Sequence, residues 1–204
     1  ITKALMEKVV ESSARNLGEG NAVLTIVRYG NVLFSRGSVI PLFMKQIKEK
    51  KTISVTEPDM TRFLLPLKEA TGLVTFALEQ GQQGDVFVRK ALSCSVGDLA
   101  QAVKNIFRSD SEIKIIGMRH GEKLYETLAS KGELLRSEDM GDYLRVTIDD
   151  RDLNYNKYLN EGDIKIVKTE DYNSQNTERM NVSEIEEMLL SQPEIISELE
   201  NRVG

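Results

Sequence analysis

Two polar clusters follow apolar runs in this chain, and their residue types suit an anionic ligand. Arg28–Pro41 follows the run Val23–Val27 and holds two arginines, two serines and two glycines. Met118–Glu126 follows Glu112–Gly117 and holds an arginine, a lysine and a histidine. Ligand sites of open α/β sheets lie beyond the carboxyl ends of strands, and phosphates favour helix starts with arginines nearby. The clusters therefore indicate a phosphate-bearing ligand, although an ordinary β–α connection with surface arginines explains the first equally well.

Two further cations need partners. Arg62 interrupts the apolar run Met60–Leu65, and burying an unpaired guanidinium is costly, so it must meet a carboxylate, a phosphate or solvent. An edge-strand arginine that points outward satisfies this requirement as well. Lys3 stands four residues before Glu7, a spacing at which a solvated ion pair on a helix is the simplest interpretation.

Strands and helices alternate in the pattern of an α/β fold with a largely parallel sheet. We expect helices over 1–17, 39–50, 67–80 and 96–107, and strands over 23–27, 52–55, 60–65, 85–89 and 112–117. Ser38 and Ser95 stand where helix N-caps are expected. In the first helix, two adjacent apolar rows predict a wide buried face: Ile1, Leu5 and Val9 in one, and Met6, Val10, Ala14 and Leu17 in the other.

The pattern loosens beyond about residue 130. Residues 137–139 and 149–152 are expected to be acidic loops, 163–168 one short strand, and 171–177 irregular. Two short acidic helices are expected at the end, with capping boxes at Ser183/Glu186 and Ser191/Glu194.

Composition excludes several classes of function. With 204 residues and a net charge of −5, the chain lacks the basic surplus of a general nucleic-acid binder. No apolar stretch is long enough to cross a membrane. A single cysteine, Cys94, forms no internal disulfide, and one histidine, His120, makes a structural zinc site improbable, so we expect no metal. The first residues, Ile1 and Thr2, fall at or inside a helix, so we expect a piece of a longer protein.

Several motifs in order resemble one family. Lys3, RYGNVLFSRGSVIPLF, MTRFLL and RHGEKLYETL together resemble the C-terminal half of an extended short-chain dehydrogenase/reductase of the nucleotide-sugar 4,6-dehydratase type. The motifs at 138–143, 151–155 and 172–177 favour the UDP-N-acetylglucosamine 4,6-dehydratase/5-epimerase subgroup of capsule and O-antigen biosynthesis. The resemblance implies an incomplete Rossmann-like parallel sheet with a small α/β substrate domain over 1–165, and a helical tail over 166–204.

The resemblance also implies roles for individual residues. Lys3 would act in catalysis and hold the nicotinamide ribose, and Tyr29 would approach the nicotinamide. The residues implied to bind the UDP-sugar are Asn31, Ser38 and Val39 for the UDP portion, Arg62 and Arg119 for the diphosphate, and Glu122 for the ribose hydroxyls. The glycine-rich dinucleotide fingerprint is absent from this stretch. We therefore expect the stretch alone to be inactive and the choice between NAD and NADP to depend on residues outside it.

The implied reaction is an internal redox cycle. Hydride leaves the sugar C4, water is lost across C5 and C6, and hydride returns at C6. A UDP-sugar 4-epimerase of the same fold, or a non-catalytic oligomerisation or binding fragment, remains an alternative. The partners implied are a UDP-sugar and further copies of the chain, in the cytoplasm, with neither nucleic acid nor membrane.

Overall fold

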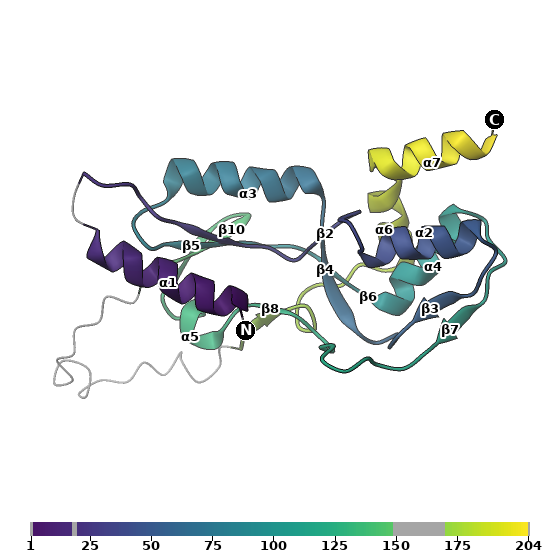
Figure 1. Ribbon diagram of the computed structural model, residues 1–204, viewed down its shortest axis with the longest axis horizontal. Coiled ribbons are helices and arrows are strands. Elements are labelled where there is room, and N and C mark those ends of the chain that lie inside the picture. The colour runs from purple at the N-terminus through teal and green to yellow at the C-terminus, as the bar shows by residue number, and fades with distance from the viewer. Residues whose placement is uncertain (1, 18–19, 149–169, 204) are drawn as a thin grey trace. The chain divides into compact units, whose positions relative to one another are not determined.

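The computed structural model describes residues 2–17, 20–148 and 170–203 (Figure 1). The chain forms two compact units, each assembled from separate segments. Unit 1 comprises Ile1–Tyr29, Lys68–Lys90 and Thr127–Tyr172, and unit 2 comprises Gly30–Leu67, Ala91–Glu126 and Asn173–Gly204. The expected strand at 163–168, the loop at 149–152, the motif at 151–155 and the boundary after residue 165 lie outside the described residues. The domain boundaries proposed from the sequence therefore stay predictions.

Helices and strands alternate as expected, and the α/β class is confirmed. The helices are α1 (Thr2–Asn16), α2 (Val39–Lys48), α3 (Leu67–Gln80), α4 (Val96–Ile106), α5 (Lys131–Leu134), α6 (Val182–Leu190) and α7 (Pro193–Val203). The strands are β1 (Ile26–Arg28), β2 (Asn31–Val32), β3 (Ile53–Val55), β4 (Thr61–Leu65), β5 (Val86–Arg89), β6 (Ser93–Ser95), β7 (Ile113–Ile115), β8 (Thr127–Ala129), β9 (Ser137–Met140), β10 (Tyr143–Val146) and β11 (Tyr172–Asn173). None of the helices in the described part of the chain is both long and apolar enough to cross a bilayer.

Unit 1 is built on a four-stranded sheet with the order β1-β5-β10-β9. β1 and β5 run parallel, and β10 runs antiparallel to β5 and β9. Adjacent residues of a strand point to opposite faces, so Val86 and Phe87 face different sides. Val86 packs near Val10 of α1, and Phe87 packs with Leu73 of α3. The two helices therefore cover opposite faces of the sheet (Figure 1).

The predicted buried face of the first helix is confirmed only at Val10 and Ala14. Leu5, Met6 and Val9 are 64%, 59% and 59% exposed, and Ala14 is the buried residue of α1. Only the side of the helix that carries Val10 and Ala14 meets the sheet. The other described residues of the two apolar rows are exposed, because no element of unit 1 that the structure describes covers them.

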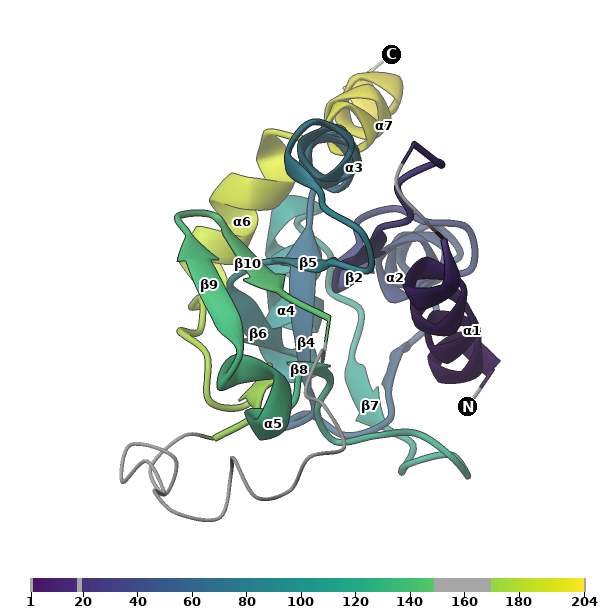
Figure 2. The same cartoon turned by 90° about the vertical axis from the view of Figure 1, so that its left-hand side faces the viewer.

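The acidic loop expected at 137–139 is a strand. β9 pairs with β10 over four residues (Figure 2). Charged side chains are common on edge strands because they discourage pairing with other chains. Here Glu138 reaches Arg145 and Asp139 reaches Lys90, so the acidic composition marks a sheet edge.

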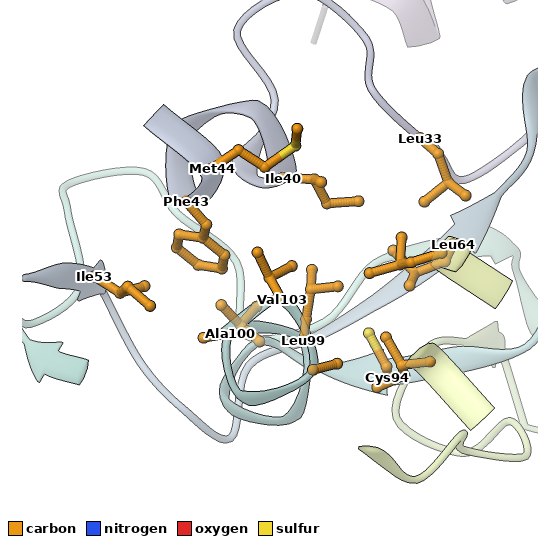
Figure 3. Close-up of a cluster of buried hydrophobic side chains, with 14 of the residues drawn as sticks. Leu33, Ile40, Phe43, Met44, Ile53, Leu64, Cys94, Leu99, Ala100 and Val103 are labelled. Atoms are coloured by element: carbon orange, nitrogen blue, oxygen red, sulfur yellow. The ribbon is translucent and has the colours of Figure 1, made fainter. Parts of the chain in front are cut away.

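Unit 2 packs helices against short strands around one apolar core. β4 pairs in parallel with β2 and antiparallel with β6, and β3 pairs in parallel with β7. Figure 3 shows side chains of α2 and α4 facing one another in this core, among them Phe43, Leu99 and Val103. Cys94 of β6 is also buried there. Burial and the nearby carboxylate of Asp98 raise the pKa of its thiol to about 12, although the charge of Arg62 acts in the opposite direction. The thiol is therefore not a nucleophile.

The helix caps of unit 2 agree only in part with expectation. Ser95 caps α4, and its Oγ accepts the Asp98 N–H at 2.9 Å. Ser38 stands at the N-cap of α2, but its hydroxyl makes no capping bond.

Both predicted capping boxes near the C-terminus are wrong. α6 begins two residues earlier than expected, with a box between Asn181 and Glu184, and Ser191 is its C-cap. Asn is as good an N-cap residue as Ser. The helix that begins at this earlier position buries Ile185 and Leu189 completely.

Gly30 marks a close approach between strand backbones in unit 2. A Cβ at this position would overlap the Cβ of the fully buried Phe63 and lie 3.2 Å from its Cγ. We expect Gly30→Ala to destabilise the protein by about 1–3 kcal/mol, the usual cost of overpacking, measured by urea unfolding. The control is Gly132→Ala in α5, where no atom lies within 4 Å; a similar loss there would contradict this explanation.

Candidate functional site

A cavity of about 250 Å³ opens within unit 2 and gathers all six of the predicted substrate residues. Its lining includes Asn31, Ser38, Val39, Arg62, Arg119 and Glu122. Its apolar wall comes from α2, α4 and β4, through Ile40, Phe43, Leu64 and Leu99. The two polar clusters, which are about 80 residues apart in the sequence, therefore meet at one site. An apolar wall with a few converging polar groups is the usual composition of a ligand pocket.

Ser38 supplies a free hydroxyl to the lining of this cavity. Its Oγ is buried and has no hydrogen-bond partner within the described residues. A buried hydroxyl without a partner costs free energy, and most such groups in folded proteins are satisfied. The unsatisfied hydroxyl at the N-terminus of α2 is therefore consistent with a ligand atom as its partner.

Arg62 has protein partners and is not an outward-pointing edge residue. Its side chain is 16% exposed. The guanidinium donates to the backbone oxygens of Thr61 at 2.6 Å, Lys123 at 2.8 Å and Leu124 at 3.4 Å. Its Nε lies 3.7 Å from Glu126 Oε1. Arg62 thus lines the cavity and at the same time ties β4 to the segment that follows Arg119 and Glu122.

Arg119 and Glu122 form a turn at the rim of the cavity. The Arg119 N–H donates to Glu122 Oε2 at 2.9 Å, and the Glu122 N–H donates to Arg119 O at 3.2 Å. Gly121 adopts φ +85°, a conformation that glycine takes at little cost. Arg119 is exposed, and its guanidinium makes no ion pair within the part of the chain that the structure describes. Its charge is therefore available to an anion in the cavity.

The two residues predicted to meet the cofactor, Lys3 and Tyr29, belong to unit 1. Lys3 is exposed on α1, and Tyr29 is 43% exposed directly after β1. The ion-pair interpretation of Lys3 is wrong, because both oxygens of Glu7 accept from Arg28, at 3.0 and 2.7 Å. Among the described residues Lys3 has no partner, so its ammonium is available to a ligand hydroxyl.

Arg28 is a structural arginine, contrary to its place in the first polar cluster. Besides Glu7, it donates to both carboxylate oxygens of Glu133, at 3.0 and 2.8 Å, and to Leu128 O at 3.1 Å. Burial by itself raises the pKa of Glu133, but hydrogen bonds from Arg28 and from Ser130 outweigh it and lower the pKa to about 2. Arg28 thus joins α1, the end of β1 and the capping box of α5 within unit 1.

Some lining residues were not predicted from the sequence. Ser54 and Thr56 come from the end of β3, and Met60 precedes β4. By its composition, the segment Thr56–Asp59 indicates only a turn. Its place after a strand in the parallel pair β3–β7 was the signal that could have found Thr56, because ligand sites gather at such ends.

The fold and these sites define the class of protein first. A sheet that helices cover on both faces, with polar side chains gathered beyond the ends of strands, is the usual arrangement of ligand-binding α/β proteins. The sequence profile of the polysaccharide biosynthesis protein family matches residues 1–148, and that of the polysaccharide biosynthesis protein C-terminal family matches residues 149–195. The chain therefore belongs to the polysaccharide biosynthesis protein family.

Individual relatives agree with this assignment. The chain is 49% identical over 201 residues to a UDP-glucose 4-epimerase of Rickettsia felis, covering 98% of this chain and 59% of the relative. The X-ray structure of Pen from Bacillus thuringiensis superposes with a TM-score of 0.77 at 31% identity, covering 91% of this chain and 54% of that one. A UDP-glucose 4-epimerase of Thermotoga maritima with UDP-glucose shares the fold, with a TM-score of 0.51, 21% identity, and coverage of 58% and 40%. The chain thus spans about three fifths of the curated relatives' length.

Proposed function

We propose that this chain is the substrate-binding part of a UDP-sugar-modifying enzyme, a UDP-N-acetylglucosamine 4,6-dehydratase with 5-epimerase activity. The observation that carries the proposal is the cavity of unit 2, in which Asn31, Ser38 and Val39 meet Arg62, Arg119 and Glu122. The names of the curated relatives and the fold shared with sugar-nucleotide enzymes support a UDP-sugar substrate.

The chemistry of the lining suits the parts of such a substrate. A guanidinium matches a diphosphate by charge and by its fork of donors, and a carboxylate matches a ribose diol. The free hydroxyl of Ser38 offers one more partner for a polar atom of the nucleotide. At about 250 Å³, the cavity lies just below the volume usual for drug-sized ligands, roughly 300–1,000 Å³. It would therefore enclose part of the nucleotide sugar.

Lys3 and Tyr29 are the residues of this chain that fit a nicotinamide cofactor. The Lys3 ammonium, which has no partner within the described residues, would donate to ribose hydroxyls and favour the deprotonated form of a neighbouring acid. The exposed Tyr29 ring would pack beside the nicotinamide. When bound, NAD or NADP supplies reversible hydride exchange with the sugar.

The substrate assignment is tested at the arginines of the cavity. We expect Arg119→Lys and Arg62→Lys, in the full-length protein, each to weaken UDP binding about ten-fold or more. A charge-assisted contact contributes roughly 1.5–3 kcal/mol, at 1.4 kcal/mol per factor of ten, and Lys offers a point charge in place of a fork. The measurement is titration calorimetry with UDP.

Arg108→Lys is the matched control, since Arg108 is an exposed arginine of unit 2 outside this cavity. Its affinity for UDP should equal that of the unmodified protein. Unchanged affinity in both cavity variants would remove the diphosphate assignment.

A UDP-sugar 4-epimerase is the second candidate, because several curated relatives carry the name UDP-glucose 4-epimerase. Mass spectrometry of the product distinguishes the two reactions. Dehydration gives a product lighter by one water, whereas 4-epimerisation gives an isomer of unchanged mass. The configuration of C5 in the dehydrated product shows whether C5 epimerisation also occurs; deuterium at C5 in D₂O does not, because dehydration itself exchanges that proton.

A further inference from the structure

The segment Asn173–Arg179 of unit 2 is a compact turn that holds Ser174 in one place. Asn173 Oδ1 accepts the N–H groups of Gln175 and Asn176 at 2.8 and 3.0 Å, and Asn173 O accepts the Thr177 hydroxyl at 2.7 Å. Short polar side chains that bond to the backbone two residues on stabilise such turns. The sequence predicted only irregular structure here. The turn fixes the direction of the Ser174 side chain, which is completely buried.

Ser174 fills every hydrogen-bonding position of its hydroxyl. Its Oγ accepts the Glu126 N–H at 3.0 Å, donates to Thr61 O at 3.1 Å and lies 2.9 Å from Thr61 Oγ1. Its own N–H donates to Glu126 O at 2.9 Å. One serine therefore binds both backbone groups of Glu126 and attaches them to β4. A buried network that is fully satisfied in this way is rigid.

Glu126 ends the segment that carries the rim of the cavity. Upstream, this segment is fixed where the Ile116 N–H donates to Val55 O at 2.8 Å. Downstream, it is fixed where the Thr61 N–H donates to Leu124 O at 2.8 Å and where Ser174 holds Glu126. The turn of Arg119 and Glu122 lies between these two attachments and is bonded mainly to itself.

We propose that Ser174 is a positioning residue for the cavity of unit 2: by holding Glu126 against β4 it sets the place of Arg119 and Glu122. It does not line the cavity itself, so it acts through the segment 117–126. Arg62 reinforces the same attachment through Lys123 O. The segment that matches the C-terminal family, residues 149–195, thereby contributes to ligand binding without touching the ligand.

Hydrogen exchange of the full-length protein tests the inference directly. In Ser174→Ala the Glu126 N–H loses its acceptor, so we expect amides in 119–126 to exchange about ten-fold faster, equivalent to about 1.4 kcal/mol of local opening. Ser93→Ala is the control, because Ser93 is equally buried and, within the described residues, its hydroxyl makes one long contact of 3.4 Å, to Glu178 O. Unchanged exchange in Ser174→Ala, or the same acceleration in Ser93→Ala, overturns the proposal.

Thr61→Val provides a second route if Ser174→Ala does not fold. It removes the other hydroxyl of the same pair with little change of shape and should accelerate the same amides by a smaller factor. No acceleration in this variant counts against the proposal.

A kinetic comparison separates positioning from a general loss of stability, and it rests on the proposed function. We expect KM for the UDP-sugar to rise about five-fold or more in Ser174→Ala with kcat nearly unchanged, since the displaced residues bind and do not react. If kcat falls and KM does not change, the positioning role is wrong. If the unmodified protein binds no UDP, the proposed function fails, and hydrogen exchange alone decides the role of Ser174.

Discussion

Lys3→Ala in the full-length protein is expected to lower turnover about 100-fold or more while the fold is retained. Lys3 is exposed and has no partner within the described residues, so its removal breaks no contact that the structure shows. In the proposed enzyme, its ammonium orients the cofactor ribose and assists proton transfer, and a positioned acid–base group contributes roughly 10²–10⁴-fold. The measurement is the steady-state rate with a UDP-sugar, with the fold checked by circular dichroism.

Lys8→Ala on the same helix is the control. Lys8 is also exposed and pairs with Glu11 at 2.8 Å, so its loss changes the charge of α1 equally without touching the proposed site. Near-normal turnover in Lys3→Ala, or an equal loss in Lys8→Ala, would show that Lys3 has no specific catalytic role.

Arg28→Met is expected to destabilise the protein by about 3 kcal/mol, the lower end of the range for removing one partner of a buried ion pair. The guanidinium satisfies two largely buried carboxylates, whose side chains are 17% exposed in Glu7 and 14% exposed in Glu133. A methionine fills similar space but leaves both carboxylates without their cation. Urea unfolding at neutral pH measures the change, and Lys51→Met, which breaks a pair with Glu49 in which the two side chains are 67% and 38% exposed, should cost much less.

The pH dependence gives an independent check on the role of Arg28. The pKa of Glu133 is lowered from 4.5 to about 2 in the folded protein. The unfolded state therefore binds the proton more readily, and the stabilisation is fully present above about pH 4.5 and is lost as the pH falls through 2. The difference in stability between the unmodified protein and Arg28→Met should shrink over this window. A difference that is constant down to pH 2 would mean that Glu133 does not depend on Arg28.

The sequence determined the local elements, because their signals are local. Apolar periodicity located α2, α3 and α4 to within two residues, and Ser95 caps α4 as predicted. The position of polar clusters after strands also pointed to Arg119 and Glu122 without a structure. These features depend on neighbours a few residues away, which a sequence shows directly.

Only the tertiary structure decided the roles of the charged side chains and of the tail. Arg28 and Arg62 look alike in the sequence, yet the first binds Glu7 and Glu133, and the second binds backbone oxygens near Lys123. The contact between Ser174 and Glu126 joins residues 48 positions apart. A buried guanidinium must be paired, and a carboxylate, a carbonyl or a ligand satisfies this requirement equally. Which of these partners it meets therefore depends on which distant segments fold beside it.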